Sequence, residues 1–428
     1  MTENEELGYI GKVRLFNADA RLFIAFNAMR AFSWSMGGVI LNLYMVEAGF
    51  EADFLGVFLA VAMFATAGVS IIAGLFTDRR SRKNIILVSS VVSFFAIALQ
   101  YAVLEATWLL ISQALLGFSS AFIMVAWSPY VTGLSTSKER AHLFGFSSGI
   151  ALLAVLAGSI LGGYLPHLLM ELQGVAPTLF WAYRKTLWLS LLPLAVSTLI
   201  VVPMTRDRPT AVTRSFGIGH IKNSRFIAKY AVTVTVVGMG AGIIVMYFNL
   251  FFSWWGADSA LIGLVFGLNI LVLSAGNFLA PAMADRIGKV KTVVITEALS
   301  IPFLLMLYWS PFFSLAVLAY IARATLMNMA GPISNALFME GLTKEERSTA
   351  MGVVGTGDQF VRGVGAIIGG WFLAAGLYKE PYLLVSGLYV LAVVMFYYFF
   401  KNKEREIEAL TKAKVTLAEE IESTSDII

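Results

Sequence analysis

The sequence predicts an all-α membrane protein with twelve transmembrane helices in two pseudo-symmetric six-helix bundles. Three observations predict this fold: an apolar composition, apolar runs of bilayer-spanning length, and a second half that repeats the first. Of the 428 residues, 58% are hydrophobic and 14% are charged. A soluble domain of this size could not bury so many apolar side chains, so lipid must be the solvent for many of them.

Apolar segments of about 20 residues occur twelve times, and that length spans the hydrocarbon core of a bilayer. The runs are too long and continuous for barrel strands, and an open sheet cannot satisfy its backbone groups in lipid. The expected spans are residues 22–46, 54–76, 85–104, 107–132, 143–166 and 185–204 in the first half, and residues 227–253, 259–283, 292–309, 312–339, 350–375 and 381–400 in the second.

The distribution of basic residues predicts the orientation. Of the 31 lysines and arginines, 25 fall on the side that carries both chain ends, 3 fall on the opposite side and 3 fall within spans. Positively charged loops are retained in the cytoplasm, so we expect a multi-pass protein of the plasma membrane with both termini cytoplasmic. The expected parts are an N-terminal segment (1–21), a first bundle (22–204), a linker (205–226), a second bundle (227–400) and a cytoplasmic tail (401–428).

An offset of 207 residues relates the two halves. It pairs Asn42 with Asn249 and Gly56 with Gly263, and it is lost only after the fifth span, where the first half has a longer loop. Such a repeat predicts two units of the same topology related by an axis along the membrane normal.

A short basic turn, GLFTDRRSRK from Gly74 to Lys83, joins the second and third spans, and it recurs 207 residues later as PAMADRIGK. With two six-helix halves and this turn, the chain resembles the major facilitator superfamily of secondary transporters over residues 21 to 400. Ser81 stands where the signature of that family has its second glycine. The resemblance implies alternating access with a cytoplasmic gate at this turn. The gate residues it suggests are Gly74, Asp78, Arg82, Lys83, Asp285, Arg140 and Arg347.

The aspartate of this turn carries the gate hypothesis. A carboxylate near the cytoplasmic end of the second span can meet the positive N-terminus of a helix from the other half. The alternative is that the whole turn only anchors the topology, which explains its arginines but not the repeated aspartate. We therefore expect Asp78 to act in the gate and most of the arginines to be anchors.

Glycine-rich runs mark the fifth and eleventh spans. The run GSILGG resembles a motif of drug/proton antiporters in the same superfamily, with Ser159 in place of the proline, and GAIIGG is its repeat. The fourth span has Gln113 where that resemblance would place a proton-coupling arginine. Small residues let helix backbones approach closely, so we expect a tight seam between the halves. The glycines of this seam are Gly158, Gly162, Gly163, Gly365, Gly369 and Gly370.

Polar groups within spans are candidate sites because they are costly in lipid. Arg30 could offer a cation to an anionic substrate group, or it could be a buried structural pair. In the tenth span Asn328 and Asn335 share one helix face. The expected substrate cavity contains Arg30, Trp34, Trp127, Arg323, Asn328 and Asn335.

Two further pairs have expected roles in transport. Asn42 and Asn249 are expected to clasp across the halves as an outer gate, or else to satisfy the helix backbone. Asp358 and Arg362 are one helical turn apart and can pair. We expect Asp358 to carry or gate a coupling proton with Arg362 as its counter-ion; the alternative is a static ion pair that fixes the eleventh span.

No feature of the sequence indicates an enzyme. The chain has no cysteine and only three histidines, which lie far apart, and it has no glycine-rich nucleotide loop. We therefore expect no metal, no cofactor and no nucleic-acid partner, but a lipid-embedded monomer with a small-molecule substrate and a proton as coupling ion. The expected function is proton-coupled efflux of an amphipathic compound. The alternatives are proton-coupled uptake of a small polar or anionic metabolite, and a non-transporting receptor or lipid-handling protein.

Overall fold

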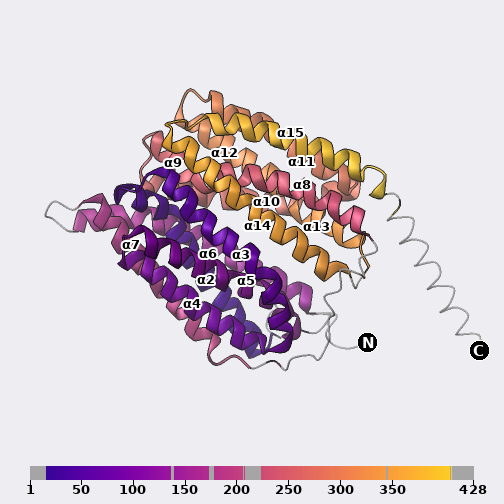
Figure 1. The fold of residues 1–428 in the computed structure, drawn as a ribbon, viewed down its shortest axis with the longest axis horizontal. Coiled ribbons are helices and arrows are strands. Elements are labelled where there is room, and N and C mark those ends of the chain that lie inside the picture. Colours follow the sequence, from indigo (N-terminus) through magenta and orange to yellow (C-terminus); the bar gives the residue numbers. More distant parts are fainter. Residues whose placement is uncertain are drawn as a thin grey trace, which may run out of the picture. The chain divides into compact units, whose positions relative to one another are not determined.

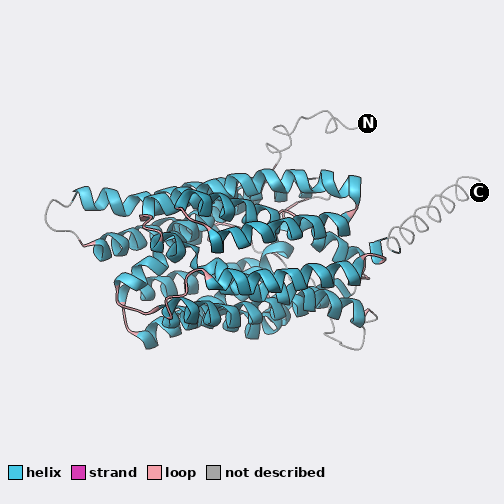
Figure 2. Ribbon diagram, turned by 90° about the horizontal axis from the view of Figure 1, so that it is seen from above, coloured by secondary structure: helices cyan, strands magenta, loops and turns pink. Residues whose placement is uncertain are grey.

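The computed structural model describes residues 16–135, 139–172, 178–205, 207, 223–343, 346–404 and 406. The side chains of Leu75, Asp78, Arg79 and Ala141 lie outside this description. Within the described ranges every regular element is a helix (Figure 2). This confirms the all-helical prediction.

Six long helices form the first half and run side by side (Figure 1). They are unbroken because their sequences keep an apolar character for 21 or more residues, even where a proline lies inside α5, α6 or α7. Their bounds are α2 Ala18–Glu47, α3 Ala52–Arg79, α4 Arg82–Ala102, α5 Ala106–Gly133, α6 Arg140–Leu172 and α7 Leu179–Val201.

The second half has the same order of spans, but two of them are broken. The seventh consists of α8 (Ser224–Ile244), a 3₁₀ turn (Val245–Tyr247) and α9 (Phe248–Trp254). The tenth divides at Met329 and Ala330, where Pro332 opens a new helix because proline fits the first helical turn. The remaining bounds are α10 Ser259–Ile287, α11 Lys289–Trp309, α12 Phe313–Asn328, α13 Gly331–Glu340, α14 Glu346–Ala374 and α15 Glu380–Phe400.

Ten spans in the described chain are long and apolar enough to cross a membrane, counting α8 to α9 and α12 to α13 as one each. The helices α2 and α14 have 30 and 29 residues, so they are also long enough, but they carry more polar side chains. They complete the twelve predicted spans.

The chain divides into two compact units. Unit 1 comprises Met1–Ser215, Gly238–Leu271 and Gly355–Pro381, and unit 2 comprises Phe216–Val237, Val272–Val354 and Tyr382–Ile428. Unit 1 therefore holds the six helices of the first half together with segments of α8, α10 and α14 and the whole of α9.

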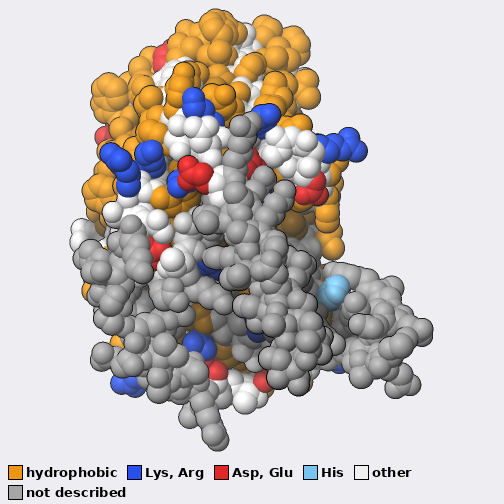
Figure 3. Space-filling model, turned by 90° about the vertical axis from the view of Figure 1, so that its right-hand side faces the viewer, with side chains coloured by type: hydrophobic (Ala, Val, Ile, Leu, Met, Phe, Trp, Pro, Cys, Tyr) orange, Lys and Arg blue, Asp and Glu red, His pale blue; other side chains and the backbone are white. Residues whose placement is uncertain are grey.

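In each unit the connections between helices fall at two ends. In unit 1 the distal end carries the connections α2–α3, α4–α5, α6–α7, α9–α10 and α14–α15, and the terminal end carries α3–α4 and α5–α6. In unit 2 the terminal end carries α10–α11 and α13–α14, and α11–α12 lies at its opposite end. Lysine and arginine side chains are visible at the terminal end together with aspartates and glutamates (Figure 3).

Candidate functional site

Two asparagines join α2 to α9 within unit 1. The Nδ2 of Asn42 donates to Oδ1 of Asn249 at 3.0 Å and to the carbonyl of Met246 at 2.7 Å. In return, Nδ2 of Asn249 donates to the carbonyl of Val39 at 3.1 Å. Both amides are buried and contribute hydrogen bonds across the halves as well as to helix backbone. The expected contact is present; its role as a gate stays a prediction.

The double variant Asn42→Cys/Asn249→Cys is expected to form a disulfide, because the two side chains meet directly and the native chain has no cysteine. Crosslinking on addition of an oxidant can be measured by gel mobility after protease cleavage in the linker. If the pair opens during transport, a transported compound should change the yield. A matched control is Asn42→Cys alone, and an unchanged mobility of the double variant under every condition would contradict the prediction.

The last glycine of each glycine-rich run crosses between the halves within unit 1. A Cβ on Gly163 would lie 2.3 Å from the carbonyl oxygen of Ser259 and 2.8 Å from Cα of Gly263. A Cβ on Gly370 would lie 2.5 Å from the carbonyl oxygen of Ala52 and 2.8 Å from Cα of Gly56. The 207-residue repeat relates these two crossings, α6 on α10 and α14 on α3. Only glycine permits backbones to approach so closely.

The other glycines of the two runs pack within their own half. Gly158 and Gly162 lie against the backbone of α2 at Phe32 and Met36, and Gly365 and Gly369 lie against α8 at Met239 and Ile243. The seam that the sequence predicted between the halves is therefore divided. Adjacent residues on a helix differ by about 100° in direction, so Gly162 and Gly163 contact different neighbours.

Asp358 and Arg362 form an ion pair on α14. The Nε of Arg362 donates to Oδ2 of Asp358 at 2.7 Å, and the aspartate side chain is 21% exposed. The other carboxylate oxygen, Oδ1, is buried and has no hydrogen-bond partner in the described chain. It lies at the surface of Gly238 on α8, where a Cβ would come within 2.2 Å of it. The pair therefore faces α8, a helix of its own half.

Arg30 lies near the middle of α2, with its guanidinium carbon 5.7 Å from the ring centre of Trp34. Its Nη1 is buried without a hydrogen-bond partner among the described residues. Trp34 is 42% exposed. The second aromatic expected in the cavity, Trp127, packs edge-on against Phe23 with ring centres 4.6 Å apart, so it packs against the apolar core of unit 1.

The remaining cavity candidates lie in unit 2. Arg323 is only 2% exposed and its Nη2 donates to the hydroxyl of Tyr389 at 2.6 Å, which holds it between α12 and α15. Asn335 accepts a hydrogen bond from Tyr230 of α8 at 3.2 Å. Asn328 donates to the carbonyl of Ala324 in its own helix at 2.7 Å. These contacts join α8 to α13, whereas Arg323 contacts α15.

The basic residues of the first turn have partners within unit 1. Arg82 lies 3.7 Å from Asp207 of the linker, and Nζ of the buried Lys83 donates to the carbonyl of Val202 at 2.8 Å. A Cβ on Gly74 would meet no atom within 4 Å. The side chain of Asp78 lies outside the described residues, so its gate role stays a prediction.

Arg140 and Arg347 make equivalent contacts in the two halves. Arg140 donates to the carbonyl of Thr132 at 3.5 Å and Arg347 donates to that of Met339 at 3.0 Å. Both carbonyls lie at the C-terminal ends of helices, where a cation is favourable. Asp285, in the second turn, is exposed.

Two carboxylates that sequence reasoning missed cap equivalent helices at the terminal end. Asp207 accepts from the backbone N–H of Lys83 at the start of α4, at 3.1 Å. In unit 2, Glu404 accepts from the N–H groups of Lys289 and Val290 at the start of α11. Negative charge is stabilising at a helix N-terminus. A carboxylate shortly after the sixth span of each half was the available indication.

Glu346 ties the start of α14 to the start of α8. Its carboxylate accepts from the N–H and Nδ2 of Asn223 at 2.8 and 3.0 Å, and from the N–H and Oγ1 of Thr343 at 3.2 and 3.1 Å. Burial acts to raise the pKa of Glu346, but the hydrogen bonds from Asn223 and Thr343 outweigh it and lower that pKa from 4.5 to about 2. The ionised form is therefore the one that stabilises the fold.

Glu346→Gln is expected to lower the melting temperature at neutral pH by a few degrees, since a lost helix cap costs about 1 kcal/mol. The folded pKa is below the unfolded one, so the stabilisation is complete above pH 4.5 and is lost as the pH falls toward 2. The difference between variant and wild type should thus shrink in acid, as thermal melts at pH 7 and pH 3.5 would measure. Glu139→Gln, the equivalent change in the first half, is the control. An equal effect of both variants would contradict the assignment.

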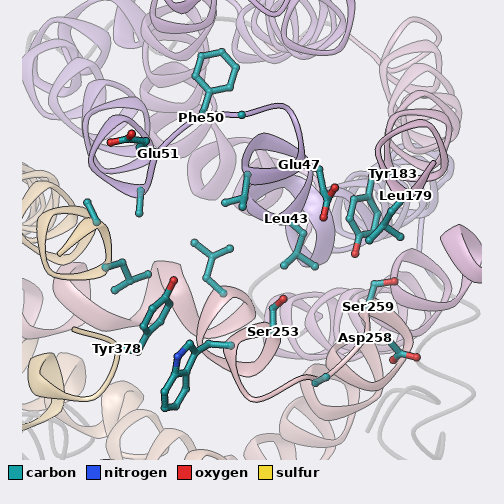
Figure 4. A pocket seen from close by; sticks show the side chains of 18 of the residues that line it. Leu43, Glu47, Phe50, Glu51, Leu179, Tyr183, Ser253, Asp258, Ser259 and Tyr378 are labelled. Atoms are coloured by element: carbon teal, nitrogen blue, oxygen red, sulfur yellow. The ribbon is translucent and has the colours of Figure 1, made fainter. Parts of the chain in front are cut away.

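A cavity of about 670 Å³ opens at the distal end, and all of its lining belongs to unit 1 (Figure 4). Its floor includes Leu43 and Leu250, the chain neighbours of Asn42 and Asn249, so the cavity lies against the paired amides. The polar and aromatic residues of its lining are Glu47, Phe50, Glu51, His167, Tyr183, Ser253, Trp254, Asp258, Ser259 and Tyr378. None of these lining residues is among the site residues predicted from the sequence.

A known protein family and several known proteins match this chain. A family model described as Major Facilitator Superfamily matches residues 23–255 and 230–424. "Multidrug resistance protein MdtG" of Proteus mirabilis (strain HI4320) is 24% identical over 384 residues, which are 86% of this chain and 92% of that protein. The MdtG of Salmonella typhimurium is 24% identical over 251 residues, 58% of this chain and 60% of that protein.

Solved structures share the fold at low sequence identity. A bacterial homologue of the human lysosomal transporter Spinster, inward-facing and unoccupied, matches with a TM-score of 0.70 and 12% identity, covering 91% of this chain and 98% of that one. A D-xylose–proton symporter matches with a TM-score of 0.69 and 14% identity, covering 92% and 98%. The family match extends over nearly all the described helices, and so the chain belongs to the major facilitator superfamily of secondary transporters.

Proposed function

We propose that this transporter exports an amphipathic organic compound in exchange for protons. The observation that carries the proton coupling is the Asp358–Arg362 pair, in which one carboxylate oxygen is paired and the other is buried without a partner. A carboxylate in that setting can take up a proton when its surroundings change. Protonation removes the negative charge of the carboxylate, part of which lies on the buried oxygen that has no partner. The printed name of the MdtG relatives, multidrug resistance, supports efflux of organic compounds.

The distribution of charge gives the orientation of the protein in the membrane in this proposal. The terminal end is rich in lysine and arginine, so it is cytoplasmic in this proposal, and the distal end faces outward across the plasma membrane. The two bundles, residues 22–204 and 227–400, rock about a midplane site, with Asp78 and its turn at the cytoplasmic gate and the Asn42–Asn249 pair at the outer one. The protein acts as a monomer.

Arg30 supports a second candidate function. Its buried Nη1 has no partner in the described chain, and a transported anion could supply one. Proton-coupled uptake of a small anionic metabolite would use Arg30 in this way. A receptor or lipid-handling protein on the same fold remains the candidate of another class.

Flux in proteoliposomes tests the proposal. Purified protein is reconstituted with an imposed pH gradient, and the movement of a panel of fluorescent amphipathic compounds and of small carboxylates is followed. Export is supported if an amphipathic compound moves against its gradient while protons move the other way. Movement of carboxylates alone would favour the uptake function, and ligand binding without any flux would favour a receptor.

A further inference from the structure

The volume and lining of the distal cavity indicate the chemical class of substrate that it can bind. Its volume of about 670 Å³ lies within the range of small-molecule pockets, and its walls combine apolar and aromatic side chains with a few polar groups. We propose that this cavity binds an organic cation with an apolar or aromatic body. The cavity is then the site that the substrate occupies before release, an assignment that rests on the proposed export function.

Charge is the first argument for a cation. Glu47, Glu51 and Asp258 line the cavity together with His167, and among the described lining there is no lysine or arginine. Asp258 accepts from the N–H of Leu261 at 2.8 Å, which leaves its charge in place. Glu47 and Glu51 have no hydrogen bond or ion pair with the described residues. The lining therefore has three carboxylates and no lysine or arginine, which gives it a net negative charge.

Two of these carboxylates recur through the internal repeat. Glu51 and Asp258 are 207 residues apart, and each precedes the second span of its half. Each follows a tight turn with a glycine at positive φ, Gly49 at 89° and Gly256 at 84°. Only glycine adopts this backbone conformation readily. The two halves thus bring equivalent carboxylates to one cavity.

The aromatic wall is the second argument. Trp254 stacks on Tyr378 with ring centres 5.3 Å apart and planes at 12°, which fixes one wall of the cavity. Next to it, the ammonium of Lys379 lies 5.5 Å from the ring centre of Trp254 and 4.8 Å from that of Trp255. Aromatic faces attract cations, and this wall already attracts one from the chain itself. Phe50 and Tyr183 add further aromatic surface to the lining.

Tyr183 and Ser259 of the lining connect the cavity to the contact between the halves. Tyr183 forms a side-chain hydrogen bond with Ser259, and Oγ of Ser259 donates to the carbonyl of Gly163 at 2.8 Å. Figure 4 shows Glu47 and Tyr183 directed into the same space. A cation held by Glu47 would therefore lie beside the α6–α10 crossing, and separation of that crossing would open its path.

The test uses tetraphenylphosphonium, a cation with an aromatic body, and the detergent-purified full-length chain. Its binding is measured by equilibrium dialysis for wild type, Glu47→Gln/Glu51→Gln, and the control Glu105→Gln/Glu171→Gln. The control removes two exposed glutamates of the distal end that do not line the cavity. The cavity variant is expected to bind about tenfold more weakly and the control to stay within about twofold of wild type. Asp258 is kept because it caps α10.

Three outcomes would overturn the inference. They are equal affinity in the two double variants, binding of the neutral triphenylphosphine oxide as tightly as the cation, and displacement of the probe by calcium alone. Export of the probe is measured on the same proteins in proteoliposomes. Export with unchanged affinities refutes this site but not the exporter, whereas carboxylate-dependent binding without export refutes the exporter but not this site.

Discussion

Asp358→Asn is expected to abolish transport driven by a pH gradient while leaving the protein folded in the membrane. Asparagine keeps the size of the side chain but cannot exchange a proton. It also loses the charge that pairs with Arg362 at 2.7 Å. We therefore expect a fall of at least about tenfold in gradient-driven flux, below the contribution of about 10²–10⁴-fold that a positioned proton-transfer group makes in catalysis. The measurement is uptake or release by vesicles with and without an imposed pH gradient.

Exchange without a gradient separates coupling from binding. In Asp358→Asn, exchange of labelled for unlabelled substrate at equal pH should persist, because it needs the moving halves but no net proton transfer. The double variant Asp358→Asn/Arg362→Gln should restore any lost thermal stability, since it removes the uncompensated guanidinium that the single change leaves. The control is Asp53→Asn, which changes an exposed carboxylate at the start of α3. Wild-type dependence of flux on the gradient in Asp358→Asn would show that the pair is a static link between α14 and α8.

The 207-residue repeat predicted more of the contacts than any single motif did. It paired Asn42 with Asn249 and Gly56 with Gly263, and each of these residues lies at a contact between the halves. A repeat can predict contacts because two similar units facing each other bring equivalent positions together. Length and apolarity predicted the helices for a different reason: lipid leaves few alternatives to a continuous helix.

Local geometry at the helix breaks and faces could not be predicted in this way. The turn at Val245–Tyr247 contains no proline or glycine, so the break between α8 and α9 has no marker in the sequence. Nor could residue type separate Gly162, which packs on α2, from Gly163, which packs on α10. That distinction depends on the rotation of α6 about its axis, which is set by the packing of all its neighbours.

Side chains with several possible roles were the hardest to assign. Trp127 was expected in the cavity but packs on Phe23, and Arg323 was expected there but is buried against Tyr389. An aromatic or an arginine within a span can serve packing or ligand binding equally well, and its type does not distinguish them. Asp207 and Glu404 were missed because the longer loop in the first half disrupts the 207-residue offset before either residue is reached.

Gly163→Ala is expected to reduce transport at least as severely as loss of Asp358, by preventing closure of the distal end. The new Cβ would lie 2.3 Å from the carbonyl oxygen of Ser259, and neither that backbone nor the backbone of Gly263 is a flexible neighbour that can give way. The protein should still fold, because this contact joins two halves that must separate in an alternating-access cycle. Flux should fall about tenfold or more. Raising the free energy of the closed state by about 1.4 kcal/mol would lower the population of that state about tenfold.

The control for this variant is Gly149→Ala on the same helix, where a Cβ meets no atom within 4 Å, so flux and stability should stay near wild type. Gly158→Ala gives the opposite contrast. Its Cβ would lie 2.5 Å from the carbonyl of Phe32 within the first half, so it should lower the yield of folded protein. Closure can be read directly by adding Gly163→Ala to the Asn42→Cys/Asn249→Cys pair, whose disulfide yield should then fall. A normal yield with normal flux would mean that the α6–α10 crossing can widen without opening the distal end, and that closure depends on the paired amides instead.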